Sequence, residues 1–355
     1  MTTAPPRARG YRGARRPTLK DVAALAGVSM KTVSRVVNGE PGVAPAKVES
    51  VERAVRQLDY RPNLTASSLR RLDGRTAAVA ALLEDLANPF SAELHRALED
   101  VAHEHDVLLF AGSLDESPER EKRLVRAFTS RRADALILAP ATSDQGYLTY
   151  EVPEGTPIVF VDRAPSGYEA DAVVADNVDG ARRAVTHLIG HGHRRIAFLG
   201  DRTAIQTARD RFAGYQQALH ARGVPFDPDL VVHGLEDAGR AAAALPRLME
   251  LRDPPSALFA AQNEITVGAI RHLQAAELQD RVAIVGFDDF PLADLLRPGV
   301  TVVAQDPTAI GRAAAERVFA RLAGDSTPAR TVVIPTRLVV RGSGEIPAPA
   351  GPRRP

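Results

Sequence analysis

Residues 18–37 of the chain read TLKDVAALAGVSMKTVSRVV, and this stretch predicts two short helices joined by a tight turn. Helical spacing places Val22 and Ala23 on one face of the first helix. Gly27 suits a left-handed C-cap, and the hydroxyl of Ser29 suits an N-cap two residues later. The second helix therefore begins almost where the first one ends, which is typical of a helix-turn-helix.

The second helix, from Met30 to Val37, is predicted to have an apolar stripe at Val33 and Val36. Its other face is polar and carries Lys31, Thr32, Ser34 and Arg35. A third helix is predicted at about Pro45 to Leu58. Its apolar side, formed by Val48, Val51, Val55 and Leu58, closes a three-helix core. In a helix-turn-helix the second helix inserts its N-terminal residues into the DNA major groove, so this unit is expected to bind DNA.

The charge of the chain is divided unevenly along its length. The 355 residues carry a net charge of +1, but residues 1–75 hold 15 Lys/Arg against 6 Asp/Glu, or +9. Residues 76–355 hold 30 Lys/Arg against 38 Asp/Glu, or −8. A basic segment ahead of a mildly acidic globular part is expected of a nucleic-acid-binding head, because each cation that meets a phosphate releases counterions. For residues 1–17 alone, a solvated basic tail is the favoured interpretation.

Four stretches carry a resemblance to a known family: residues 18–23 (TLKDVA), 26–29 (AGVS), 32–38 (TVSRVVN) and 60–63 (YRPN). Together they resemble the head of the lactose-repressor/galactose-repressor family of transcription regulators, and the likeness extends to about residue 342. The resemblance implies that Met30 and Lys31 read bases and that Arg35 reaches a base edge. Arginine to guanine is the commonest specific pairing, and packing is the alternative role for Met30. The other head residues that the resemblance implies at the DNA are Thr18, Leu19, Ser29, Thr32, Ser34 and Asn38.

A short amphipathic segment follows the head at residues 63–71 (NLTASSLRR). A helix this short is marginal in water, so it is expected to form only when something else stabilises it. The resemblance implies that two such hinge helices pair in the minor groove, with Leu69 wedged between base steps and with Asn63 and Ala66 beside it. A flexible linker with one exposed leucine is the alternative.

From residue 76 the pattern changes to short apolar runs that alternate with amphipathic helices, which predicts parallel α/β structure. Two successive series indicate two doubly wound lobes, so the fold class is α/β with an all-α helix-turn-helix head and a core like that of periplasmic binding proteins. The resemblance implies that the chain recrosses between the lobes near residues 303–304 and 334–336. The expected division is a disordered basic tail over 1–17, a DNA-binding domain over 18–62, a hinge over 63–75, an effector-binding core over 76–342 and a flexible tail over 343–355. Within the core, lobe 1 is expected at about 76–175 and 304–334, and lobe 2 at about 176–303 and 335–342.

Several polar residues fall where predicted strands end or helices begin, and ligands of such folds bind at the carboxyl ends of the strands. Carboxylates, amides and a guanidinium that converge on one cleft can pair with hydroxyls or a carboxylate of a ligand. An Asp after a strand is also often a helix cap. The family likeness favours effector contacts, which are expected at Phe90, Asp162, Thr207, Arg211, Gln262 and Asp288. Relatives usually have Asn-Asp where this chain has Gln262-Asn263, which weakens the assignment of a particular sugar.

Other function classes find little support. The chain has no glycine-rich phosphate loop, no GxSxG elbow and no HExxH, so no catalytic residue is assigned, and no cofactor is expected. A sugar kinase or hydrolase with a DNA-binding head and a secreted sugar-binding protein are the alternatives. Cysteine is absent, and His191 and His193 are expected in a solvated loop rather than at a metal. No apolar run approaches the roughly 18 residues of a membrane span, and a cytoplasmic location without membrane contact is expected.

The expected partners follow from this interpretation. One helix-turn-helix covers a half-site, so a homodimer on double-stranded, palindromic operator DNA is the minimum assembly. The tail from Gly344 to Pro355 has no heptads that would form a coiled coil. The effector is expected to be a small molecule, such as a sugar or a related metabolite, that controls a repressor.

Overall fold

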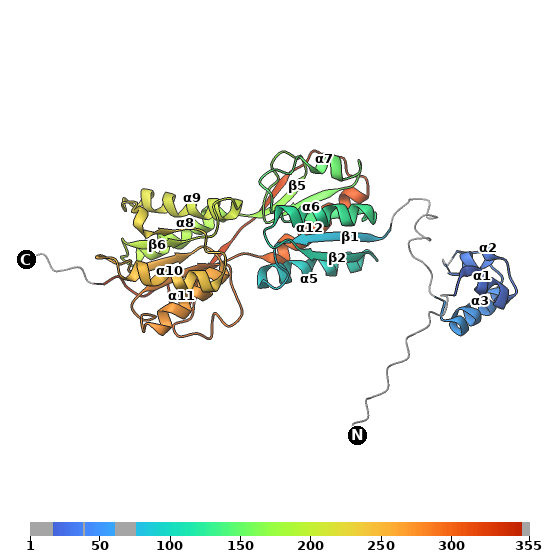
Figure 1. Cartoon of the computed structure of the whole chain (residues 1–355), viewed down its shortest axis with the longest axis horizontal. Helices are drawn as coiled ribbons and strands as arrows, with labels where there is room; N and C mark the ends of the chain where they lie inside the picture. Colours follow the sequence, from blue (N-terminus) through green and yellow to red (C-terminus); the bar gives the residue numbers. More distant parts are fainter. Residues whose placement is uncertain (1–16, 38–39, 61–75, 350–355) are drawn as a thin grey trace, which may run out of the picture. The chain divides into compact units, whose positions relative to one another are not determined.

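The computed structural model describes residues 17–37, 40–60 and 76–349 (Figure 1). The chain divides into two compact units, a head that ends at Thr76 and a core that begins at Ala77.

The head contains the three predicted helices, α1 (Leu19–Ala26), α2 (Met30–Val37) and α3 (Pro45–Leu58). Gly27 ends α1 with a φ of 66°, the left-handed conformation that its sequence position predicts. The hydroxyl oxygen of Ser29 accepts a hydrogen bond of 3.2 Å from the backbone nitrogen of Thr32 and so caps α2. Val22, Val33 and Val51 are fully buried at the centre of the unit. Local capping and one small apolar core therefore account for the head.

The core contains two six-stranded sheets. In the first sheet, the strand order is β11-β5-β4-β3-β1-β2 and all neighbours are parallel. Its strands are β1 (Ala78–Leu83), β2 (Leu108–Ser113), β3 (Ala135–Leu138), β4 (Ile158–Val161), β5 (Asp171–Ala175) and β11 (Thr331–Ile334). In the second sheet, the order is β12-β10-β9-β8-β6-β7, and only β12 is antiparallel to its neighbour. Its strands are β6 (Ile196–Leu199), β7 (Val231–Val232), β8 (Ala257–Ala260), β9 (Ala283–Phe287), β10 (Thr301–Ala304) and β12 (Arg337–Val339).

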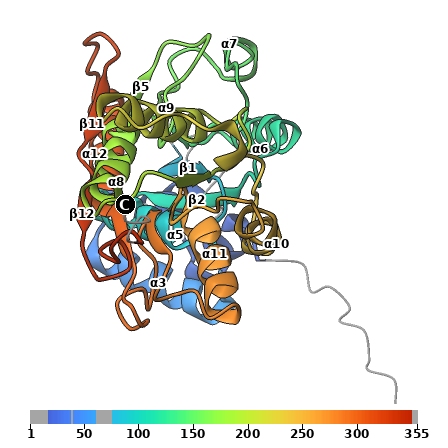
Figure 2. The ribbon, with the colours of Figure 1, turned by 90° about the vertical axis from the view of Figure 1, so that its left-hand side faces the viewer.

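Helices cover both faces of each sheet, and we call each sheet with its helices a lobe (Figure 1). Lobe 1 has α5 (Pro89–Glu104), α6 (Pro118–Ser130), α7 (Leu148–Glu151) and α12 (Pro307–Leu322). Lobe 2 has α8 (Asn177–Gly190), α9 (Gln206–Ala221), a short 3-10 turn (Pro228–Leu230), α10 (Ala238–Met249) and α11 (Asn263–Ala275). The chain crosses between the lobes three times: after β5, between β10 and α12, and between β11 and β12. Figure 2 shows α8, α12, β11 and β12 on the same side of the molecule.

The sequence pattern did not predict six elements of the core: β5, α7, β10, α12, β11 and β12. In α12 the buried side is made largely of small residues, and Gly311 lies so close to α5 that a Cβ atom would sit 2.8 Å from the carbonyl oxygen of Leu94. β5 begins with a buried aspartate, Asp171, which accepts hydrogen bonds of 3.0 Å from Arg317 and 2.7 Å from Arg321. Both features lower the apolar contrast that reveals helices and strands in a sequence.

The prediction of a solvated loop at His191 and His193 was wrong for His193. This side chain is fully buried, and its ring nitrogens lie 2.8 Å from the hydroxyl of Ser256 and 2.8 Å from the carbonyl oxygen of Ile346. A residue near the chain's C-terminal end therefore covers the loop, a long-range contact that local sequence does not reveal.

Close packing of α9 on α8 gives a stability prediction. A Cβ atom at Gly214 would lie 2.2 Å from the carbonyl oxygen of Val178, so Gly214→Ala must push the helices apart. We expect it to lower the free energy of unfolding by about 1–3 kcal/mol, measured by urea denaturation. Gly190→Ala, at the end of α8 with open space around it, is the control, and it should be neutral or slightly stabilising. Equal effects of the two substitutions would contradict the packing argument.

Candidate functional site

Two aspartates occupy equivalent positions in the two lobes. Asp162 directly follows β4 and Asp288 directly follows β9, and both adopt left-handed backbone conformations with φ of 65° and 70°. Aspartate tolerates this conformation better than most residues, and non-glycine residues held there cluster at functional sites. In each lobe this left-handed turn lies at the carboxyl end of a strand, and the carboxylates of Asp162 and Asp288 line the same cavity there.

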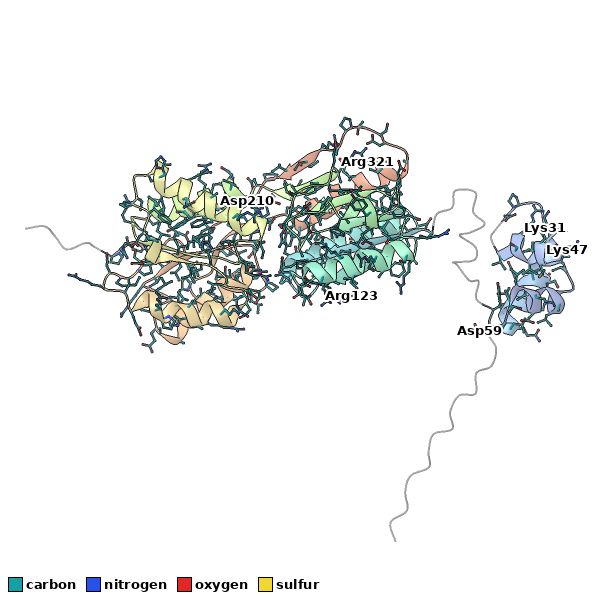
Figure 3. All side chains as sticks on the ribbon, turned by 45° about the horizontal axis from the view of Figure 1, so that its top comes forward. Lys31, Lys47, Asp59, Arg123, Asp210 and Arg321 are labelled. Carbon is teal, nitrogen blue, oxygen red and sulfur yellow. The ribbon has the colours of Figure 1, made fainter. Side chains whose placement is uncertain are left out.

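The cavity lies between the lobes, because both lobes line it. Lobe 1 contributes Glu84, Asn88, Phe90, Asp162 and Arg163, and lobe 2 contributes Asp201, Ile205, Thr207, Ala208, Arg211, Ala261, Gln262 and Asp288, with Gln305 from the crossing after β10. Its free volume is only about 40 Å³, which suffices for about one water molecule. Larger cavities of about 350 Å³ and 290 Å³ adjoin it on either side, since they share Phe90 and Arg163, respectively, with its wall. Asp210, labelled on α9 in Figure 3, lines the second of these.

Arg211 makes three hydrogen bonds in the wall of this cavity. Its Nε donates to Asn177 at 2.8 Å, and its Nη1 donates to the carbonyl oxygen of Ala261 at 2.8 Å and to Asp288 at 3.2 Å. The guanidinium also lies 3.9 Å from the ring centre of Phe287. Arg211 and Asp288 are almost fully buried, so their ion pair is screened little by solvent.

The lobes are joined directly across the cavity by two amides. Asn88, the N-cap of α5, and Asn263, the first residue of α11, exchange hydrogen bonds of 3.2 and 3.0 Å. The cleft is therefore closed at this bridge, and its larger free spaces lie in the two adjoining cavities.

Acidic groups predominate at the centre of the cavity. Burial raises the pKa of Glu84 to about 8, with a further contribution from the nearby carboxylate of Glu116. Burial also raises the pKa of Asp162 and of Asp201. Arg163 compensates part of this charge through a two-pronged ion pair with Glu116.

The structure brings all six predicted effector contacts together on the wall of this one cavity: Phe90, Asp162, Thr207, Arg211, Gln262 and Asp288. Sequence reasoning missed Glu84, Arg163, Asp201 and Gln305, which also line it. Glu84, Asp201 and Gln305 follow β1, β6 and β10 within two residues, so the strand-end rule that identified Asp162 could also have found them. Whether these residues contact an effector stays a prediction.

In the head, the predicted DNA contacts lie on and beside α2. Met30 is 54% exposed, and Lys31 is exposed as well, so neither side chain is buried in the apolar centre of the head. Leu19, by contrast, packs against the apolar centre of the head. Figure 3 labels Lys31 on α2 and Lys47 near the start of α3. The predicted contacts Asn38, Asn63, Ala66 and Leu69 lie outside the described residues.

Arg35 is tied to the loop that follows α2. Its Nη2 donates to the carbonyl oxygen of Pro41, and its Nε lies 3.4 Å from the carboxylate of Glu40. Both side chains of the ion pair are partly exposed, so the pair is worth at most about 1 kcal/mol and is broken easily. Within the described residues, Thr18 forms a capping box with Asp21, to which its backbone nitrogen donates at 2.7 Å.

The described residues lack both a metal-binding cluster and a membrane-spanning helix. They contain no group of three or more His, Asp or Glu side chains arranged to hold a metal ion. None of the helices in the described ranges is long and apolar enough to cross a membrane.

Comparisons with known proteins agree with this architecture. The family model described as bacterial regulatory proteins, lacI family, matches residues 18–63, and the periplasmic binding protein-like domain matches residues 185–344. The HTH-type transcriptional regulator CelR of Thermobifida fusca is 34% identical over 340 residues, which cover 93% of this chain and 99% of CelR.

Two solved structures extend the comparison. A complex of the transcriptional regulator CelR with cellobiose is 32% identical, with a TM-score of 0.68 over 92% of this chain and all of that one. The lac repressor dimer bound to operator and the anti-inducer ONPF is 25% identical, with a TM-score of 0.81 over 93% of this chain and 99% of that one. The chain therefore belongs to the LacI family of bacterial transcription regulators, a family of DNA-binding proteins rather than enzymes.

The raised pKa of Glu84 gives a pH prediction. The folded protein holds this proton up to about pH 8, whereas the unfolded chain loses it near the ordinary pKa of 4.5. The stabilising contribution is therefore complete below pH 4.5 and is lost as the pH rises to about 8. Unfolding free energies measured by urea titration should fall across this range more steeply for the native chain than for Glu84→Gln. Parallel curves for the two proteins would show that Glu84 titrates normally.

Proposed function

We propose that this chain is a repressor whose affinity for operator DNA is controlled by a small molecule bound between the two lobes of the core. One observation carries the proposal: the six side chains predicted as effector contacts, distant in the sequence, line one cavity at the carboxyl ends of the strands. This is where doubly wound α/β folds bind their ligands. The proposed division is a DNA-binding domain over 18–62, a hinge over 63–75 and a core over 76–342.

For DNA recognition, we assign base reading to Met30 and Lys31, at the start of α2, and to Arg35, in its last turn. The exposure of Met30 and Lys31 supports this assignment, as does the weak ion pair of Arg35, which a guanine can displace. Thr18, Leu19, Ser29, Thr32, Ser34 and Asn38 are proposed to lie at or near the DNA backbone. Pairing of two hinge segments in the minor groove, with Leu69 as the wedge, rests on sequence alone.

For the effector, the cellobiose complex of CelR supports a sugar or a sugar derivative. An effector can change DNA affinity only if it binds two conformations of the core unequally. The closed cleft, with about 40 Å³ of free space and the Asn88–Asn263 bridge, supports such a mechanism. A ligand larger than the central cavity must extend into the adjoining cavities, open the lobes or displace the bridging side chains.

A homodimer on a palindromic operator is the proposed assembly, in line with the lac repressor dimer on its operator. β2 offers a surface for it, because this strand lies at the edge of its sheet and exposes Leu108 (58%) and Phe110 (49%). Exposed apolar edge strands tend to pair with another chain. We propose the cytoplasm as the location, since operator DNA is found there.

Arg35 provides the test of the DNA-binding assignment. Arg35→Ala should relax base preference at one symmetric pair of operator positions by about 1–3 kcal/mol, because a two-pronged contact to guanine is lost. Competition binding to operator variants measures this effect. Arg56→Ala, which removes an exposed arginine at the end of α3, is the control and should leave base preference unchanged. Equal weakening on operator and random DNA would refute base reading by Arg35.

Asp288 provides the test of the effector site. Removing the Asp288 side chain would leave the buried guanidinium of Arg211 without its carboxylate partner. Asp288→Asn is therefore the better variant, because its amide oxygen can still accept a hydrogen bond from Arg211. Gln305 can adapt by turning its unpaired Oε1 toward the new amide. We expect operator affinity to be retained, while any sugar that raises the thermal stability of the native chain loses about tenfold in affinity. A native dose response of operator release in Asp288→Asn would remove Asp288 from the effector site.

A further inference from the structure

Several hydrogen-bond donors on the cavity wall are bonded to the protein, although the Nε of Arg163 has no hydrogen bond within the described residues. The Nε and Nη1 atoms of Arg211 are bonded to three protein oxygens. The Nη1 of Arg163 donates to Glu116 at 2.9 Å and to the carbonyl oxygen of Pro140 at 2.9 Å. The Nη1 atoms of both guanidinium groups are therefore committed to protein oxygens.

Acceptors on the same wall are left over. The buried Oε1 atoms of Gln262 and Gln305 have no hydrogen-bond partner in the described part of the chain. The orientation of Gln305 is fixed, because its Nε2 donates to Asp288 at 2.6 Å. The carboxyl group of Glu84 has no hydrogen bond within residues 17–37, 40–60 and 76–349. These atoms can accept hydrogen bonds from the donors of a ligand or from water.

Negative charge is also in excess. The wall carries four carboxyl groups, of Glu84, Asp162, Asp201 and Asp288, against the two guanidinium groups of Arg163 and Arg211, and the raised pKa of Glu84 leaves the other three to carry the negative charge at neutral pH. Arg211 is paired with Asp288 and Arg163 with Glu116. The carboxylate of Asp162 lies 3.3 Å from the Nε of Arg163, which is already paired with Glu116. The carboxylate of Asp201 lies farther from its cation, at 3.9 Å from the Nε of Arg202. Carboxylates that are buried without full compensation are costly, and a cation restores the balance.

We propose that the effector carries a protonated amine beside hydroxyl groups, as in an amino sugar or an amino polyol, with the amine among Glu84, Asp162 and Asp201. This proposal rests on the proposed function, since it concerns the same cavity. An ammonium group has three donors and no acceptor, which matches the unpartnered acceptor atoms of Gln262 and Gln305. Sugar phosphates and sugar acids are expected to bind more weakly, because their charge adds to the excess of carboxyl groups on the wall.

Binding of the amine is coupled to a proton. The charged groups around Glu84 are Glu116 after β2, Asp162 and Arg163 after β4, and Asp201 after β6. Burial and these carboxylates raise the pKa of Glu84 to about 8, so the ligand-free cleft holds a proton there at neutral pH. An arriving ammonium ion favours the ionised carboxylate and displaces this proton. Effector binding therefore releases a proton, which a neutral sugar would not do.

Matched sugars test the proposal on the full chain. Glucose, glucosamine, N-acetylglucosamine and glucose 6-phosphate, together with the galactose and mannose counterparts, are compared by thermal shift and calorimetry at about pH 7. We expect at least one free amine to bind about tenfold or more tightly than its neutral, acetylated and phosphorylated forms. Its binding heat should differ between buffers of unequal ionisation enthalpy, which reports the released proton.

Two variants separate the charge effect from general damage. Glu84→Gln should weaken the amine about tenfold and abolish proton release, whereas Glu154→Gln, at an exposed site of lobe 1, should change neither. Any of three outcomes overturns the proposal. A neutral or phosphorylated sugar binds more tightly than the matching amine, an amine binds Glu84→Gln as tightly as the native chain, or no amine in the panel binds. Failure of the chain to bind palindromic DNA in a mobility-shift assay would instead refute the proposed function, because the sugar titrations do not depend on DNA.

Discussion

The buried ion pair of Arg211 and Asp288 is the constraint on which the core depends. Arg211 connects α9 to the start of α8, to the end of β8 and to the end of β9 through Asn177, Ala261 and Asp288. Such a pair contributes little net stability, but it is costly to break on one side only. It therefore fixes where these elements end relative to one another. The left-handed backbone at Asp288 is held by the same contacts, together with a hydrogen bond of 2.9 Å from its nitrogen to the carbonyl oxygen of Val303.

The closed cleft follows from this arrangement. The chain crosses between the lobes three times, so the lobes can move on short connections without unfolding. Across the cleft they are held by a pair of neutral amides, Asn88 and Asn263, which a ligand with hydroxyl or amine donors can replace. A rigid charged centre and a weak neutral bridge together suit a core that must change conformation on binding.

The head follows a different physical logic from the core. Its three helices are short and share one small buried centre. Caps such as Gly27 and Ser29 therefore largely determine where the helices begin and end. Its polar residues on α2 remain accessible, and Arg35 is bound only by a partly exposed pair with Glu40 and a contact to Pro41. Such contacts exchange readily for DNA, in contrast to the fixed network around Arg211.

The sequence by itself determined the elements whose signals are local. Capping residues and apolar spacing predicted all three helices of the head, and the strand-end rule identified Asp162 and Asp288 before their neighbours were known. Periodicity failed for α12, whose buried side includes Gly311, Ala314 and Ala315 beside a buried arginine, and for β5, whose first residue is a buried aspartate. Only the tertiary structure decided that His193 is buried, that Asn88 meets Asn263 and that Glu84 joins Asp162 and Asp201 at one cavity. Each of these facts depends on residues far apart in the chain, and so does the pKa of Glu84, because burial and neighbouring charge exist only after the lobes have folded and closed.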